Sequence, residues 1–107
     1  MSYDSGLVER VLGALDTLGE RGKRQKNVFS GWGFLEGKRT FVIVWDDSLI
    51  VKTRREEYAG ALARPGVIPF TPDGGTPMGT WVVVSADAIA DDPELVEWVA
   101  MGLRGIR

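Results

Sequence analysis

The side chains that could do acid–base or metal chemistry in this sequence are three adjacent pairs of carboxylates. They are Asp46–Asp47, Glu56–Glu57 and Asp91–Asp92. Because neighbouring side chains on a strand or a helix point in different directions, the two members of a pair do not share a proton or a metal ion. We interpret the first pair as turn residues and the third as a helix cap.

The sequence also lacks the residue types on which most enzymes depend. Its 107 residues include no histidine and no cysteine. Histidine is the commonest general base and a common zinc ligand, and cysteine supplies thiolate nucleophiles and further zinc ligands. We therefore predict that the protein is not an enzyme, and we assign it no catalytic residue, no metal ion and no cofactor.

A second pattern is a run of basic and aromatic residues, KRQKNVFSGWGFLEGKRTF, in the first half of the chain. Residues 21–64 hold ten Lys or Arg against five Asp or Glu, although the whole chain has a net charge of −2. Basic side chains beside stacking rings suit single-stranded nucleic acid, whereas the acidic balance of the whole chain opposes it. The candidates for contact with a partner are Arg24, Lys26, Trp32, Lys38, Arg39 and Trp45.

The same run is predicted to form a strand, Asn27–Leu35, followed by the turn EGKR. Its GWGFLEG stretch has the third glycine one position too late for a dinucleotide-binding loop. Nine extended residues span about 30 Å, so the basic groups Lys23–Lys26 and Lys38–Arg39 are expected at opposite ends of the strand. On this interpretation they form no compact anion site, and the segment serves mainly for packing.

Further strands and helices are predicted around this segment. Strands are expected at Thr40–Trp45, at Leu49–Lys52, and in the stretches VIPF and TWVVVS. The first helix has apolar residues at spacings of three and four: Leu7, Val11, Ala14, Leu15 and Leu18.

The ends of the helices also have recognisable signals. Asp4 or Ser5 can cap the first helix, and Thr53 and Glu56 have the spacing of a capping box before the second. The last helix is predicted to begin at a cap formed by Asp92, followed by proline at its first position.

This order predicts an α+β fold of two layers, in which helices pack on an antiparallel sheet of four to five strands. The elements follow as helix, three strands, helix, two strands, helix, in a single domain spanning residues 1–107. Both faces of the sheet are apolar, so the face away from the helices needs a cover as well. That cover is a partner protein, a second copy of the chain, or one of its own helices.

Nearly the whole chain resembles the TfoX N-terminal domain, which occurs in the TfoX/Sxy regulators of natural competence and in short free-standing bacterial proteins. The resemblance rests on KNVFSGWGFLEGKRTFVIV, LIVK and GTPMGTWVVVSADAIADDPELVEWVAMGL. Val28 and Ser30 depart from it, since the family usually has Met and Gly there. The resemblance implies the same order of helices and strands, similar to YjbR-like domains and type III secretion chaperones, and no catalytic residue.

The resemblance further implies a non-enzymatic regulatory or protein-interaction module, here as a free-standing domain. We expect a cytoplasmic protein without a membrane segment, because no leader and no long apolar run is evident. Its expected partner is another protein or a second copy of the chain. Nucleic-acid binding through the basic middle segment is the alternative.

Overall fold

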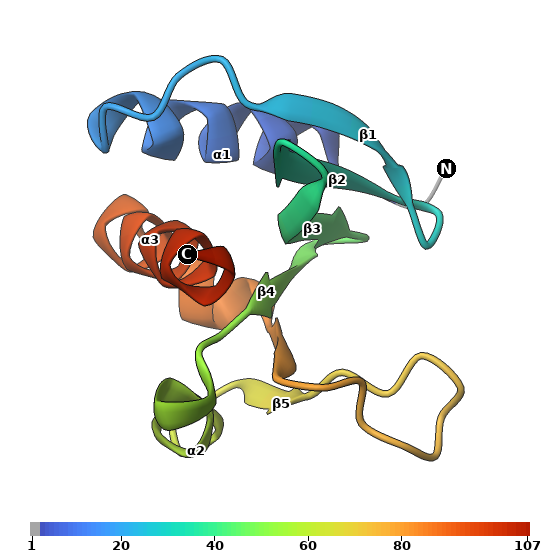
Figure 1. Cartoon of the computed structure of the whole chain (residues 1–107). Coiled ribbons are helices and arrows are strands. Elements are labelled where there is room, and N and C mark those ends of the chain that lie inside the picture. Colours follow the sequence, from blue (N-terminus) through green and yellow to red (C-terminus); the bar gives the residue numbers. More distant parts are fainter. Residues whose placement is uncertain (1–2) are drawn as a thin grey trace.

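The chain folds into a six-stranded antiparallel sheet with two long helices packed on one face (Figure 1). The computed structural model describes residues 3–107. The helices on this face are α1 (Ser5–Thr17) and α3 (Asp92–Ile106). The 3₁₀ helix η1 (Ala86–Ile89) contacts α3, whereas α2 (Arg55–Leu62) lies at the far end of the sheet from α1. In sheet order the strands are β1 (Arg24–Val28), β2 (Gly31–Glu36), β3 (Arg39–Trp45), β4 (Ser48–Lys52), β6 (Trp81–Val84) and β5 (Val67–Pro69). The predicted two-layer α+β arrangement is confirmed, with six strands in place of four or five.

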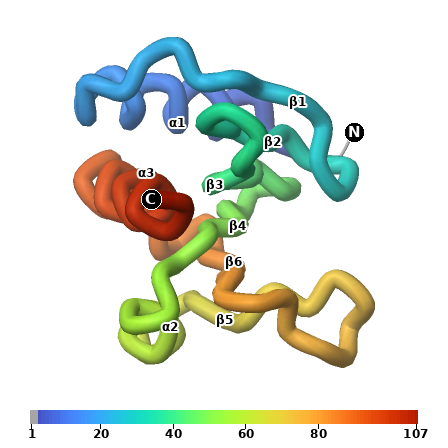
Figure 2. Tube along the Cα trace, viewed as in Figure 1, coloured from blue at the N-terminus to red at the C-terminus, as the bar shows by residue number. Residues whose placement is uncertain are grey.

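The clearest departure from the prediction is the segment before β3. The sequence predicts one strand over Asn27–Leu35, but the structure has a hairpin of β1 and β2 whose turn is formed by Phe29 and Ser30 (Figure 2). Both turn residues have positive φ angles, 52° and 67°. Gly, Asn and Asp normally occupy such turns, so neither residue signals the reversal of the chain.

The predicted cap of α1 is confirmed. The Asp4 carboxylate accepts hydrogen bonds from the backbone N–H groups of Gly6 at 2.7 Å and Leu7 at 3.3 Å. The buried side of this helix carries four of the five predicted apolar residues: Leu7, Val11, Ala14 and Leu15.

The capping box predicted for α2 is wrong. Arg54 occupies the cap position and its side chain makes no cap hydrogen bond. Thr53 instead continues the pairing of β4 with β6: its hydroxyl donates to the carbonyl of Thr80 at 2.7 Å, and the Thr80 hydroxyl donates to the carbonyl of Thr53 at 2.6 Å. Thr53 is therefore a buried residue directly after β4, and its side chain is hydrogen-bonded to the residue before β6.

The cap predicted for α3 is displaced by one residue. Asp91 holds the cap position without a side-chain hydrogen bond, and Asp92 is the first residue of the helix. The Asp92 carboxylate pairs with the guanidinium of Arg10 at 3.1 Å, so it ties α3 to α1.

Helix α3 lies unusually close to the sheet because two of its residues are glycines. A Cβ atom at Gly102 would lie 2.7 Å from the carbonyl oxygen of Phe41, and one at Gly105 would lie 2.5 Å from that of Lys52. Any larger residue at these positions would push the helix away from β3 and β4.

The two faces of the sheet are covered differently. On the helix side, valines and leucines of β3, β4 and β6 are buried against α1 and α3. On the other side, which we call the open face, Ile43 and Ile50 are buried beneath Phe70, and Met78 packs against them. This cover comes from the connection between β5 and β6, and within residues 3–107 no helix residue belongs to it.

Both edges of the sheet are protected against pairing with another strand. β5 is three residues long and ends in Pro69, which has no N–H group to donate. The other edge strand, β1, presents the exposed cations Arg24 and Lys26. Short strands, proline and lysine are common means of blocking an edge.

Candidate interaction surfaces

The β1–β2 hairpin brings the two basic groups to the same end of the sheet. Arg24 begins β1 next to the point where β2 ends, and its Nη1 donates to the carbonyl of Gly37 at 2.9 Å. Lys38 follows in the turn, and Arg39 begins β3. The prediction that these groups lie at opposite ends is wrong, because it assumed a single extended strand.

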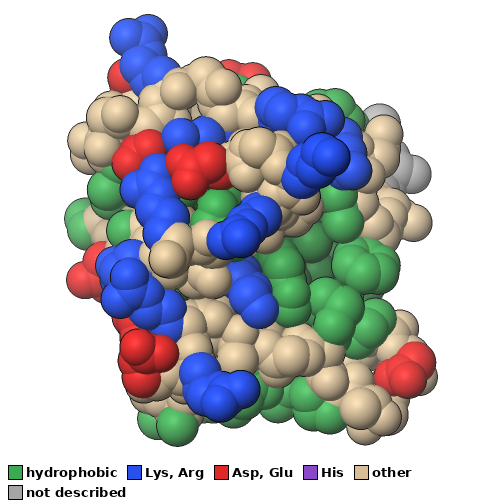
Figure 3. Space-filling model, in the orientation of Figure 1, with side chains coloured by type: hydrophobic (Ala, Val, Ile, Leu, Met, Phe, Trp, Pro, Cys, Tyr) green, Lys and Arg blue, Asp and Glu red, His purple; other side chains and the backbone are tan. Residues whose placement is uncertain are grey.

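The last turn of α3 reaches the same end. Arg39 donates to the carbonyl of Ile106 at 2.7 Å, and Arg54 donates to that of Arg104 at 3.1 Å. Cations are favourable there because the last carbonyls of a helix carry partial negative charge. We call this region the cationic end, and Figure 3 shows its Lys and Arg side chains around the C-terminus of α3. It comprises Lys23, Arg24, Lys38, Arg39, Lys52, Arg54, Arg55, Arg104 and Arg107, with Glu20, Glu36, Glu56 and Glu57.

Part of the cationic end is an ion-pair cluster that links three segments of the chain: the connection before β1, the end of β2 and the residue after α3. Arg107 lies 2.6 Å from Glu36 and 2.9 Å from Glu20, and Lys23 lies 3.1 Å and 3.0 Å from the same carboxylates. Hydrogen bonds from Arg107, and then from Lys23, lower the pKa of both glutamates to about 2. The same contacts raise the pKa of Lys23 and of Arg107. These four charges are therefore used within the fold.

Most of the other cations at this end have no such partner. Arg104 pairs with Glu57 at 2.8 Å, and its hydrogen bond lowers the pKa of that carboxyl. Within residues 3–107, no carboxylate lies at ion-pair distance from the rest, which are Arg24, Lys38, Arg39, Lys52, Arg54 and Arg55. Several of them line a cavity of about 400 Å³ together with Thr53 and Thr80.

The opposite end of the sheet is acidic. Asp4 donates its backbone N–H to the carbonyl of Asp46 at 2.9 Å, which places the start of α1 beside the β3–β4 turn. Asp47 and the residues of η1 line the same surface as Asp4, and α3 begins nearby with Asp92. The protein thus has its charges separated along the direction of the strands.

The open face carries an apolar patch around Phe70. The ring centroid of Phe70 lies 5.5 Å from that of Phe29 and 6.0 Å from that of Trp45, both in edge-to-face geometry. Phe29 is 49% exposed, Trp45 37% and Ile68 61%. These four residues define the apolar patch, and Figure 3 shows hydrophobic side chains gathered beside the cationic end.

The two tryptophans predicted as contact residues have different environments. Trp45 belongs to the apolar patch. Trp32 points to the helix side, where its ring lies 5.5 Å from that of Tyr3 and its Nε1 donates to Gln25 at 2.8 Å. Of the basic candidates, Arg24, Lys38 and Arg39 belong to the cationic end, whereas Lys26 is exposed farther along β1. The sequence analysis does not identify Phe29, Ile68 and Phe70 as surface contact residues. Ile68 and Phe70 lie outside any clear alternating pattern, and Phe29 falls within a predicted strand.

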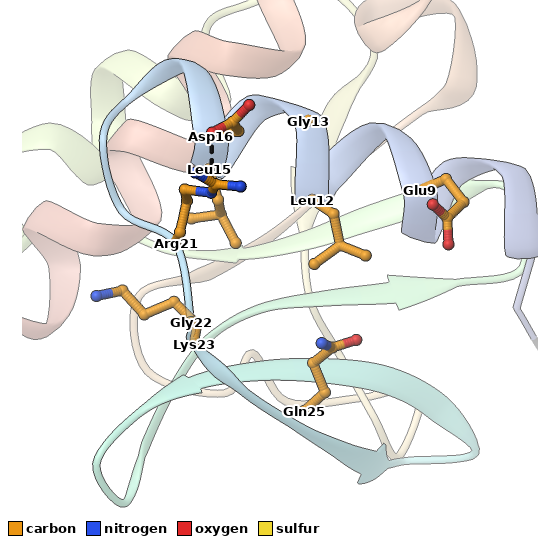
Figure 4. A pocket seen from close by; sticks show the side chains of 9 residues that line it. All are labelled: Glu9, Leu12, Gly13, Leu15, Asp16, Arg21, Gly22, Lys23 and Gln25. Carbon is orange, nitrogen blue, oxygen red and sulfur yellow. Dashed lines mark ion pairs between the residues drawn. The ribbon is translucent and has the colours of Figure 1, made fainter.

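A further cavity, of about 440 Å³, lies between α1 and the segment leading into β1 (Figure 4). Asp16 and Arg21 at its rim pair with each other at 3.2 Å, and Lys23 is held by Glu20 and Glu36. In the described part of the chain, no group of three His, Cys, Asp or Glu side chains is placed to hold a metal ion. No helix in residues 3–107 has the length and apolar character needed to cross a bilayer.

A comparison with protein-family models identifies the TfoX N-terminal domain, which matches residues 15–106. The match covers nearly the whole chain and includes both interaction surfaces except for Arg107. Searches of curated proteins and of solved structures gave no match.

Proposed function

Because the chain belongs to the TfoX N-terminal domain family, we propose that it is a non-enzymatic regulatory module of the cytoplasm that acts by binding another protein. The family is one of regulatory domains of the competence-regulator type. The proposed contact is the apolar patch on the open face. The observation that carries this proposal is the position of Phe29.

Phe29 lowers the stability of the fold at its position. It is a bulky side chain at φ 52°, a conformation that costs an ordinary residue roughly 1–2 kcal/mol. Asn or Gly would form the same turn without this strain. Strained positions are typical of functional sites, and this one holds an aromatic ring half-exposed at the edge of the patch.

The composition of the patch also suits protein binding. Aromatic residues supply a large contact area and are enriched at the centres of interfaces. Phe29 and Trp45 are both partly exposed, and each ring packs edge-to-face against the buried ring of Phe70. The patch is therefore a rigid apolar surface that needs little ordering when a partner binds.

The charges of the open face indicate a partner that differs from this chain. Among the strand residues that the structure describes, Lys26 and Lys52 lie on this face and no carboxylate does; the pairing with Gly33 and Trp81 places the two lysines. In a symmetric dimer through this face, like charges would approach one another. We therefore expect a different protein that presents an apolar segment flanked by acidic residues.

The test is site-specific photo-crosslinking in cells that naturally contain the protein. A photoreactive residue replaces the exposed Ile68 in one variant, and in the control it replaces the exposed Glu97 on α3. We expect a discrete crosslinked protein from position 68 only, which disappears when Trp45→Ala is added. Crosslinking to a second copy of the chain, or equal crosslinking from both positions, would contradict the proposal.

A further inference from the structure

We propose that the cationic end is a second, separate interaction surface, and that it binds the phosphate backbone of double-stranded nucleic acid. Six of its cations, the set without carboxylate partners, are available for an external anion. Such a cluster is notable in a chain whose net charge is −2. The cluster forms only in the folded chain, since three strands (β1, β3 and β4), the β2–β3 turn, the segment after β4 and the first residue of α2 contribute to it.

The distribution of these cations fits a polymer better than a small anion. Neighbouring strands lie about 4.8 Å apart, so the row from Arg24 on β1 to Lys52 on β4 is about 14 Å wide. Arg54 and Arg55 follow Lys52 in the chain and line the same cavity as Lys52. A single phosphate group would contact only two or three of these side chains, whereas a backbone with repeated phosphates can contact the whole row.

The guanidinium groups are positioned in advance. Arg24, Arg39 and Arg54 each donate one hydrogen bond to a backbone carbonyl. A guanidinium has five N–H donors, so each retains donors for a phosphate oxygen. Because these side chains are already oriented, less conformational entropy is lost on binding.

The surroundings favour double-stranded nucleic acid over single strands. Base stacking on single strands requires exposed aromatic rings. At the cationic end the ring of Trp81 is partly buried, and its centroid lies 5.9 Å from the ammonium group of Lys52. Trp32 and Trp45 lie elsewhere, so the interleaving of basic and aromatic residues in the sequence is not preserved in space.

The charge separation further orients the protein on such a partner. The acidic end, with Asp4, Asp46 and Asp47, faces away from the cationic end along the strands. A polyanion would be repelled from the former and attracted to the latter, even though the chain as a whole is weakly negative.

The experiment is fluorescence anisotropy of a labelled 20-base-pair DNA duplex titrated with the protein at several NaCl concentrations. With three to five phosphates neutralised, a plot of log K against log salt should have a slope of about −3 to −5. Lys38→Ala should make the slope shallower by about 1, and Lys38→Ala with Arg55→Ala by about 2. Neither side chain has a hydrogen-bond or ion-pair partner in the described chain, so both variants should remain folded.

Arg21→Ala is the control, because it also removes one exposed positive charge, but that charge is already paired with the carboxylate of Asp16 at 3.2 Å. An equal effect of Arg21→Ala, or no binding at low salt, would overturn the proposal. Equal affinity for poly-glutamate of the same charge would assign the surface to acidic proteins instead. Trp45→Ala should leave DNA binding unchanged, so this result is independent of the proposed protein contact.

Discussion

Arg107, at the end of α3, donates hydrogen bonds of 2.6 and 3.0 Å to Glu36, at the end of β2, although 71 positions separate them in the sequence. Glu20 accepts from the same guanidinium. This contact joins the helix layer to the sheet at the cationic end.

The first prediction concerns acid stability. The pKa of Glu20 and Glu36 is about 2 in the folded protein, below the ordinary value of 4.5. Their contribution to stability is therefore present above pH 4.5 and is lost as the pH falls toward 2. Arg107→Gln should lower the melting temperature at pH 7 and flatten its decline between pH 5 and 2. The effect should be modest, because the two carboxylates are 24% and 35% exposed.

Arg21→Gln is the control for this measurement, since its partner Asp16 is largely exposed. It should retain the acid profile of the unmodified protein. If Arg107→Gln gives the same profile as the control, the cluster does not form in solution.

A second prediction distinguishes the two roles considered for Thr53. The substitution Thr53→Val keeps the shape of the side chain but removes the hydroxyl that donates to Thr80. It should lower the free energy of unfolding by about 0.5–1.5 kcal/mol. Thr53→Asp should be far more destabilising, because it places a carboxylate at a position that is 1% exposed. Tolerance of Thr53→Asp in urea denaturation would restore the capping interpretation, since Asp is a good helix cap.

The third prediction compares two helical glycines. Gly105→Ala places a methyl group against the backbone of Lys52, so we expect a loss of about 1–3 kcal/mol. Gly13→Ala on α1 meets nothing within 4 Å and should stabilise by about 0.5–1 kcal/mol. Equal effects of the two substitutions in thermal unfolding would mean that α3 lies farther from the sheet than described.

The fourth prediction concerns the β1–β2 turn. Ser30 has a φ angle of 67°, so Ser30→Gly should stabilise the protein by about 1 kcal/mol. Ser48→Gly in β4 is the control and should destabilise it, because glycine weakens a strand. If Ser30→Gly also destabilises, the hairpin is formed differently.

Elements with a regular pattern could be predicted from the sequence. Val42, Val44, Leu49 and Val51 belong to short runs of β-branched and aliphatic residues, and they are buried strand residues. The stripe of α1 is equally regular, and its cap at Asp4 is a local interaction that needs no tertiary contact. These predictions succeeded because neighbouring residues alone determine the outcome.

The failures occurred where tertiary contacts decide. Phe29 and Ser30 form a turn with positive φ angles, which Phe and Ser rarely adopt. The sequence therefore predicts one strand where the structure has a hairpin. Thr53 and Asp92 both match local capping patterns, but their side chains bind Thr80 and Arg10 from distant segments. Because the sequence does not predict this hairpin, it places the two basic groups of the cationic end at opposite ends of one strand.

The protected edges of the sheet determine how this protein behaves when it is concentrated. Fibrils grow when an exposed edge strand accepts another strand from solution. With Pro69 at one edge and Arg24 and Lys26 at the other, that route is closed in the native state. Concentrated solutions of the native protein are therefore not expected to form fibrils.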